Sequence, residues 1–419
     1  MMKTRNLTLF AAAIFAAAVS CGKESGPSGG GDKPDTPSVA PGDGTISIQW
    51  GEAQRICPGY YARVHALNDG SHVLVYASGS DGYLRYSTDG CKTFPQVQKV
   101  FIASNFESEA AIEVANSEFA QLSASNPHHP GRMIYAANLR PKKKANLRPK
   151  KKASSKTPYS IAIITSDDNG AKWSGIRNLY SSRTWATDVE KGCYEPYILE
   201  LPDGRLQIYF ADETPYYKDG LNWQNISVIE SSDGGDTWTA TPRVVSYNTK
   251  CRDGMPVAMT LNDMIFVAIE ENGLGHQHFR PKIVCTSISD NWKTPVLSSS
   301  AYRFNPLRTP IDSDKVYAGA PYLIHTDNYI VLSYLSSDGA AETGTKNATM
   351  ELAVCAIRQM KSGKFTSAMQ GRIRPFDVDQ TKSQALWGSL CDLGGDNVLA
   401  VTQWDGSVWI RPGQIITTK

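Results

Sequence analysis

The chain has 419 residues, of which 41% are hydrophobic and 10% aromatic, so it is long enough to bury a large core. Its 34 glycines and 23 prolines favour short turns over long helices. The formal net charge is only +2, and nine basic residues lie within 138–156, so the rest of the chain is slightly acidic and gives no general basis for binding nucleic acid.

The N-terminal stretch is expected to lie outside the folded domain. A basic start precedes an apolar run at 7–19, which is too short to span a bilayer and is typical of a secretory signal over residues 1–20. The letters "AVSC" resemble a bacterial lipobox, which implies a lipidated Cys21 and an outer-membrane lipoprotein facing the periplasm or the cell surface. A flexible Gly/Ser/Pro tether completes residues 21–43. The alternative is an ordinary signal peptide with a chance cysteine.

Six similar segments follow one another at a spacing of roughly 60 to 75 residues. Each has an apolar strand, a turn that often reads Asn/Pro-Asp-Gly, and a second apolar strand. The segments begin at Tyr60, Glu118, Tyr194, Asp253, Gly319 and Leu386. The remaining residues of each unit are enough for two more strands, which makes a four-stranded sheet. The sequence therefore predicts an all-β, six-bladed β-propeller over residues 44–419.

A second repeated element falls where the turn between the third and fourth strands of a unit is expected. The pattern Ser-x-Asp-x-Gly-x-Thr-Trp is complete in "SSDGGDTW" (231–238), nearly complete in "SDDNGAKW" (166–173) and "STDGCKTF" (87–94), and degenerate in "SISDNWKT" (287–294). In such turns the aspartate binds backbone N–H groups, glycine takes a positive φ and the aromatic residue packs under the next strand. They resemble the Asp-boxes, or BNR repeats, of sialidase-like propellers, and we expect them on the outer rim.

Binding sites in propellers lie at the end of the axis where the innermost strands begin. The residues expected to face one another there are Tyr61, Phe119, Glu195, Met255, Ala320 and Trp387. Glu195 is the only acid among these six, and it opens an otherwise apolar strand. This placement favours chemistry at the mouth of the ring. The alternative is a surface glutamate at a strand end.

The middle of the chain resembles the exo-arabinanase propellers of glycoside hydrolase family 93. The stretches that carry the resemblance are "VANSEFAQL", "MIYAANLRPKK", "YSIAIITSDDNGAKW", "CYEPYILELPDGRLQIYFADE", "QNISVIESSDGGDTW" and "RDGMPVAMTLNDMIFVAIEENG", within a match from about Gln54 to Asp405. The resemblance implies hydrolysis with retention, release of a disaccharide from a chain end, and a catalytic pair formed by Glu195 and Glu270, with Glu271 as the rival for the second position. We expect Glu195 to be the acid/base and Glu270 the nucleophile.

Several other side chains are expected to bind the substrate. Arg63 stands inside an apolar strand, where a charge is expected only if it faces the axis and pairs with a carboxylate or a substrate oxygen. Arg252 and Asp253 open the fourth unit and are expected to bind sugar hydroxyls, with a structural salt bridge as the alternative. The aromatic candidates, for which plain core packing is the alternative, are Tyr61, Tyr194, Tyr322 and Trp387.

The octapeptide "ANLRPKKK" occurs twice in tandem. Arg140 and Arg148 are therefore equivalent candidates for the site, and the sequence leaves open which copy approaches it. The alternative is a solvated basic loop.

No metal or other cofactor is expected, because His276 and His278 have no Asp, Cys or His partners at ligand spacing. Seven cysteines remain besides Cys21, without CxxC spacing, and a disulfide between Cys193 and Cys251 stays open. The expected partners are an oligo- or polysaccharide and, through the lipid, a membrane. We expect a monomer.

Two alternative functions remain. An exo-α-sialidase has the same fold, but it needs three arginines around a substrate carboxylate and usually a tyrosine nucleophile. Sialidases place an arginine at the end of the strand that follows the one with Glu195, where this chain has Ala211, Asp212 and Glu213. A glycan-binding lipoprotein without catalytic activity would keep the aromatic residues but would not need two acids.

Overall fold

The computed structural model describes residues 45–142, 157–182, 191–219, 223–272, 278–311, 313, 315–340, 345–359 and 369–418. Residues Gly44–Thr418 form one compact unit. The signal segment, Cys21, the tether, Arg148 and His276 lie outside the described residues. In the described part the helices are short 3-10 turns, namely η1 (Ala103–Asn105), η2 (Thr214–Asp219) and η3 (Ile357–Gln359), and none is long and apolar enough to cross a membrane.

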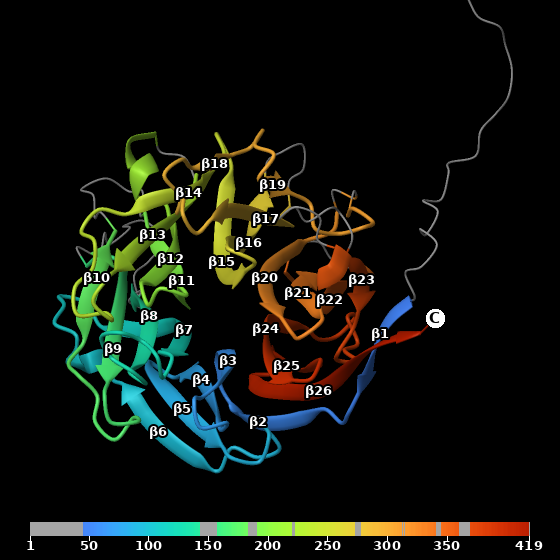
Figure 1. The fold of residues 1–419 in the computed structure, drawn as a ribbon, viewed down its shortest axis with the longest axis horizontal. Coiled ribbons are helices and arrows are strands. Elements are labelled where there is room, and N and C mark those ends of the chain that lie inside the picture. Colours follow the sequence, from blue (N-terminus) through green and yellow to red (C-terminus); the bar gives the residue numbers. More distant parts are fainter. Residues whose placement is uncertain are drawn as a thin grey trace, which may run out of the picture. The chain divides into compact units, whose positions relative to one another are not determined.

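Six antiparallel sheets surround a central axis, with the strands of each sheet in order from the inside outwards (Figure 1). Blades one to three contain β3 (Tyr60–Ala66), β4 (His72–Ser78), β5 (Asp81–Ser87) and β6 (Gln96–Phe101); β7 (Ile112–Gln121), β8 (Met133–Pro141), β9 (Ser160–Ser166) and β10 (Arg177–Ser181); and β11 (Cys193–Glu200), β12 (Leu206–Asp212), β13 (Asn225–Ser231) and β14 (Arg243–Tyr247), with β18 (Val296–Leu297) parallel to β14. Blades four to six contain β15 (Arg252–Leu261), β16 (Met264–Asn272), β17 (Arg280–Ser287) and β19 (Arg303–Phe304); β20 (Ala318–His325), β21 (Tyr329–Ser336), β22 (Thr349–Ala356) and β23 (Gln370–Ile373); and β24 (Ala385–Gly394), β25 (Asn397–Trp404), β26 (Ser407–Thr418) and β1 (Thr45–Trp50). The predicted six-bladed β-propeller is confirmed.

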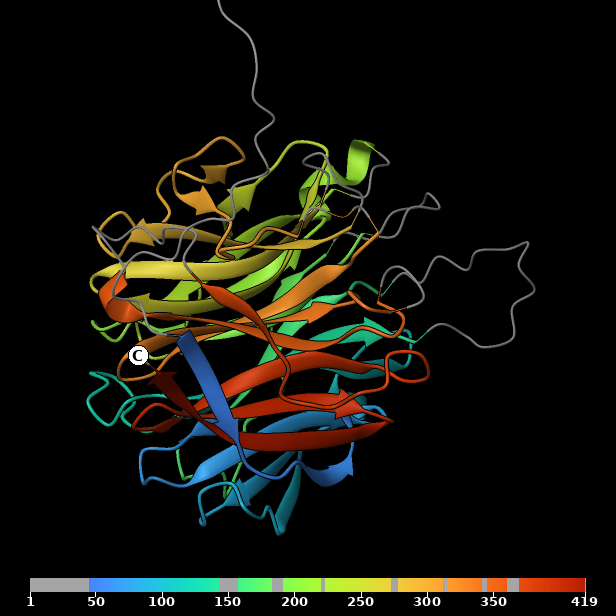
Figure 2. The same ribbon diagram turned by 90° about the vertical axis from the view of Figure 1, so that its right-hand side faces the viewer.

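The two ends of the described chain close the ring within blade six. Strand β1 pairs along its whole length with β26, from Thr45 opposite Thr418 to Trp50 opposite Gly413. Strand β2 (Gln54–Pro58) adds to the other part of β26. Figure 2 shows the first described strand, in blue, beside the last strand, in dark red. The innermost strands of neighbouring blades contact one another all the way round, so the sheet edges that face the axis are covered.

The strands inside each blade are buried on both faces. All residues of β12 and of β22 are buried, and β8 and β16 are buried except near their ends. Each blade is packed between two others, so a middle strand is a continuous apolar run rather than an alternating one. The core is therefore divided into clusters that lie between neighbouring blades.

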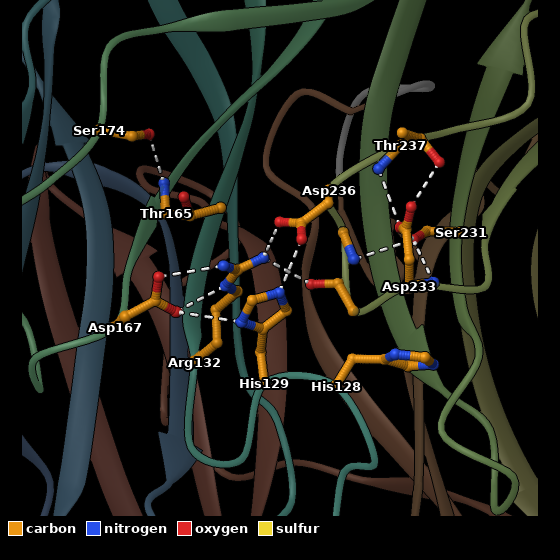
Figure 3. Close-up of polar contacts among 12 residues, drawn as sticks. His128, His129, Arg132, Thr165, Asp167, Ser174, Ser231, Asp233, Asp236 and Thr237 are labelled. Carbon is orange, nitrogen blue, oxygen red and sulfur yellow. Dashed lines mark hydrogen bonds and ion pairs between the residues drawn. The ribbon is translucent and has the colours of Figure 1, made fainter.

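The Asp-box turns lie between the third and fourth strands of blades one to three, as predicted. In the complete copy, Ser231 and the backbone N–H of Thr237 donate to Asp233, and the N–H of Gly235 donates to Ser231 (Figure 3). Gly234 and Gly235 have φ of 67° and 93°, a conformation that costs little only for glycine. The turn therefore closes on its own hydrogen bonds and makes a rigid corner.

Arg132 ties two of these corners together on the outer part of blades two and three (Figure 3). Its Nε lies 2.6 Å from Asp167 and its Nη1 lies 2.6 Å from Asp236. His129 Nε2 is 2.8 Å from the second oxygen of Asp236. The Arg132 side chain is 7% exposed, whereas both aspartate side chains are more than half exposed, so the buried charge is matched by partners that still reach water.

One β-bulge interrupts every innermost strand near its beginning. The pairing with the second strand shifts at that point in all six blades, and the extra residue takes a left-handed conformation with φ between 48° and 58°. These residues are Tyr61, Asn116, Glu195, Met255, Ala320 and Trp387. Five of the six residues that were expected to face one another at the mouth are these bulge residues. Phe119 is wrong, because β7 begins at Ile112, well before the expected start at Glu118, and Asn116 takes the equivalent place.

Candidate active site

Glu195 is the bulge residue of blade three, at the mouth of the ring. Its φ of 58° turns the side chain out of the alternating pattern of β11. The backbone N–H of Met255, the bulge residue of blade four, donates to Oε2 of Glu195 at 3.1 Å. The carboxylate therefore crosses the gap between two blades and is held by the backbone of the next one.

Glu270 reaches the same place from the end of β16. It lies opposite Gly254 in the sheet register, and its Oε2 accepts hydrogen bonds from the backbone N–H of Ala320 at 2.8 Å and from the Tyr317 hydroxyl at 3.2 Å. A Cβ atom on Gly254 would sit 3.2 Å from Oε1 of Glu270, and one on Gly319 would collide with Oε2. The two glycines make room for this carboxylate between blades four and five.

The two carboxylates flank a single peptide unit. Glu195 accepts from the N–H of Met255, and Glu270 lies against Gly254, the residue just before it. Burial and the neighbouring charge of Glu195 raise the pKa of Glu270 to about 7. Desolvation also raises the pKa of Glu195, but the charges of Arg140 and Arg252 oppose that shift. Both pKa values are therefore raised by burial, and that of Glu270 is brought near neutral pH.

Glu271 does not share this place. Successive residues of a strand point to opposite faces, so Glu271 lies on the other face of β16 from Glu270. It is fully buried, and its charge acts on Cys251 and Lys282. The rival for the second catalytic position is thus placed away from Glu195.

Arg252, Glu213 and Gln224 form one wall of the mouth. Nη1 of Arg252 lies 2.6 Å from Glu213, and its Nη2 donates to Oε1 of Gln224 at 2.6 Å. The second oxygen of Glu213 accepts from the hydroxyl of Tyr194 at 3.1 Å. Arg252 and Tyr194 were expected from the sequence, whereas Glu213 and Gln224 were not identified as part of the site.

Arg140, in the first copy of the octapeptide, approaches the site. It lies near the end of β8, where Nε donates to Oδ1 of Asn138 at 2.6 Å and Nη2 donates to the bulge residue Asn116. Its guanidinium lies 5.6 Å from the centre of the Tyr194 ring. Within the described ranges Arg140 forms no ion pair with a carboxylate. The duplicate, Arg148, lies outside these ranges.

Arg63 lies one layer below the mouth, where it fills the axis of the ring. Its Nε is 3.8 Å from Glu118, and its guanidinium carbon lies 4.0 Å from the centre of the Tyr61 ring and 5.1 Å from that of Tyr322. Arg63, Glu118 and Tyr322 are each 2% exposed. The sequence identified Arg63 as facing the axis but missed Glu118, and this layer is a floor beneath the site.

Asp253 is not accessible to a sugar. It is fully buried, forms an ion pair with Arg303 and accepts from Ser246 at 2.7 Å. The structural salt bridge, which was the alternative from the sequence, therefore describes this residue. Cys193 and Cys251 are both free thiols, so the disulfide left open by the sequence is not present.

An apolar surface surrounds the two acids. Tyr61, Met255, Tyr317 and Ala320 pack in one cluster, with Trp387 half-buried against it. Tyr317 was missed by sequence reasoning, although it stands two residues before Gly319 at the start of the fifth repeat. Burial and the charge of Glu270 raise the pKa of Tyr317 well above its ordinary value, so its hydroxyl remains a hydrogen-bond donor. Across the described ranges, no group of three or more His, Cys, Asp or Glu side chains is arranged to hold a metal ion.

Neither the family models nor the curated proteins contain a match to this chain. Solved structures, in contrast, do match this chain. The family 93 α-L-arabinofuranosidase of Fusarium graminearum, solved with arabinobiose, matches 88% of this chain and 98% of its own length with a TM-score of 0.63 and 15% identity. An α-L-arabinanase of Penicillium chrysogenum, also with arabinobiose, matches 88% and 98% with a TM-score of 0.59 and 14% identity. The Hadza microbial sialidase Hz136 matches 86% and 66% with a TM-score of 0.56 and 12% identity. At these identities the likeness shows the propeller fold alone.

Proposed function

We propose that this protein is a retaining glycoside hydrolase that acts from the chain end of α-1,5-L-arabinan or a related polysaccharide. The observation that carries the proposal is the position of Glu195 and Glu270 on either side of the Gly254–Met255 peptide, although they come from different blades. Two carboxyl groups brought together in an apolar, partly desolvated mouth are what hydrolysis with retention requires. The similar structures solved with arabinobiose support arabinan as the first substrate to test.

The charges around the pair favour the reverse of the roles expected from the sequence. Glu270 has its pKa raised to about 7 and retains a proton near neutral pH, as a general acid must. Desolvation raises the pKa of Glu195 as well, but Arg140, the Met255 N–H and Arg252 act against that rise, and this opposition is the basis for assigning the nucleophile to Glu195. Glu195 would attack the anomeric carbon while Glu270 protonates the leaving oxygen. Glu270 would then take a proton from the water that releases the sugar from Glu195.

The arginines argue against a sialidase. That reaction needs guanidinium groups free to bind a substrate carboxylate. Arg252 is paired with Glu213, and Arg63 lies in the floor with Glu118. The pairing of two such acids also argues against a purely binding role, because a buried carboxyl with a pKa near 7 costs stability that a binding protein has no reason to retain.

Two assays test the proposal. Wild type should release arabinobiose from debranched arabinan. The variants Glu195→Gln and Glu270→Gln should each lose at least a hundred-fold in kcat. Full activity in both variants would exclude these two residues as the catalytic pair. Rescue by azide then separates the roles. Azide should turn Glu195→Ala into a producer of the inverted glycosyl azide, because azide replaces the nucleophile, and should give the retained azide with Glu270→Ala.

We also propose that the protein is a monomeric outer-membrane lipoprotein attached through Cys21. Incorporation of labelled palmitate in cells, and its loss in Cys21→Ala, tests the anchor. Elution of the unlipidated 44–419 fragment at about twice its monomer mass would contradict the oligomeric state.

A further inference from the structure

Three aromatic side chains gather beside the wall formed by Arg252, Glu213 and Gln224. Tyr216 stacks on Tyr247 with ring centres 5.8 Å apart and an angle of 7° between the rings. Trp223 meets the edge of Tyr216 at 5.9 Å. All three side chains are half-buried, and none belongs to the hydrophobic core clusters of the described residues.

The chain topology places this aromatic cluster at the same end of the ring as the acids. Tyr216 lies in η2, which begins directly after Glu213, and its backbone N–H donates to the Glu213 carbonyl at 3.1 Å. Trp223 immediately precedes Gln224, which binds Arg252. Tyr247 is the last residue of β14, in the connection that leads to Arg252. Each aromatic residue is thus joined through a few residues of backbone to a side chain of the catalytic mouth.

The packing needs of the fold do not explain this cluster. The tryptophan of the next blade, Trp292, is 1% exposed, donates to the Tyr209 hydroxyl and is part of the core. Tyr216, Trp223 and Tyr247 instead keep part of their ring surface in water. Flat aromatic surfaces that adjoin a polar wall suit the C–H faces of a sugar ring, while the wall suits its hydroxyls.

We propose that Tyr216, Trp223 and Tyr247 form a second sugar-binding platform, which holds the part of the polysaccharide chain that lies beyond the bond being cut. The proposal rests on the proposed glycosidase function and specifies it further, since it makes the preferred substrate an oligosaccharide rather than a single glycoside. The platform lies over blade three, so the chain would run outwards from the mouth across this blade.

Kinetics on short and long substrates test the platform. Trp223→Ala and Tyr216→Ala should raise KM for linear arabino-oligosaccharides of six units about ten-fold, which corresponds to about 1.4 kcal/mol. The same variants should leave kcat/KM for 4-nitrophenyl arabinobioside within about two-fold, because no sugar of that substrate lies beyond the bond being cut. Tyr302→Ala is the matched control, since Tyr302 is an exposed tyrosine that belongs neither to the aromatic cluster nor to the residues described around the two acids, and it should behave as wild type on both substrates. Equal losses on both substrates, or no loss on the longer one, would overturn the proposal.

Affinity electrophoresis separates failure of the platform from failure of the enzyme assignment. Wild type should be retarded in gels that contain debranched arabinan, and both platform variants should run at the unretarded position. If wild type hydrolyses nothing but is retarded by arabinan, pectic galactan or xylan, and the variants are not, the platform stands and the proposed function fails. If wild type is retarded by none of these polysaccharides, or if the variants are retarded as wild type is, the platform is excluded.

Discussion

Removing one hydroxyl tests both the site and the roles of its acids. Tyr317 donates to Oε2 of Glu270 at 3.2 Å, and this hydrogen bond lowers the pKa of Glu270 against the larger effects of burial and of Glu195. Tyr317→Phe keeps the buried ring but loses the donor, so the pKa of Glu270 should rise. A hydrogen bond to a charged group is worth about 1.5 to 3 kcal/mol, and about 1.4 kcal/mol corresponds to one pKa unit. Because the Ala320 N–H remains in place, we expect the lower end, about one unit.

The affected limb of the pH profile identifies the role of Glu270. If Glu270 is the general acid, the alkaline limb of kcat/KM against pH moves up by about one unit, and the acidic limb stays within a few tenths. If Glu270 is the nucleophile, the acidic limb moves up instead, and the assignment made above is wrong. A profile identical to wild type would show that Tyr317 does not act on a catalytic carboxyl. Tyr329→Phe is the control, since it removes a hydroxyl that binds Thr417 in the exposed part of blades five and six.

Three further changes have calculable effects. The pKa of Glu270 is raised to about 7 in the folded protein, so the contribution of this carboxyl to stability is fully present below its ordinary pKa of 4.5 and is lost as the pH rises to 7. Glu270→Gln, which keeps the neutral form, should therefore match wild type at pH 4. At pH 8 the variant should be about 3 kcal/mol more stable than wild type in urea unfolding. Gly319→Ala pushes a methyl group into Glu270 and Tyr317, so kcat should fall about a hundred-fold. The control is Gly371→Ala, where the atom nearest to the added methyl group is 3.3 Å away, and this variant should retain the wild-type kcat. Arg132→Met removes the ion pairs between two Asp-box turns and should lower the free energy of unfolding by about 2 kcal/mol without changing kcat.

Each of these three predictions has an outcome that contradicts it. A Glu270→Gln variant whose advantage over wild type is the same at pH 4 and pH 8 would show that the carboxyl is not desolvated in the folded protein. Wild-type kcat in Gly319→Ala would mean that the two blades separate freely at this point. Loss of activity in Arg132→Met at full stability would link the outer rim to the site, which the structure gives no reason to expect.

The bulges explain why the sequence located some positions of the mouth and not others. In blades three to five the bulge residue precedes a proline, as in Glu195-Pro196, and a residue without an N–H fits where the ladder of hydrogen bonds is interrupted. In blade two no proline follows Asn116, and the repeat that is recognisable in the sequence begins at Glu118, two residues after this bulge residue. The expected position was therefore displaced to Phe119.

The sequence by itself determined the repeat, the fold, the Asp-box turns and Glu195, because these depend on local patterns of apolar residues, glycines and self-closing turns. Only the tertiary structure decided which of Glu270 and Glu271 meets Glu195, that Arg140 reaches the mouth, and that Asp253 is sealed against Arg303. The physical reason is that a shift of one residue in strand pairing moves a side chain to the opposite face of a blade. Contacts between neighbouring blades, and the pairing of β1 with β26, bring together residues that are far apart along the chain.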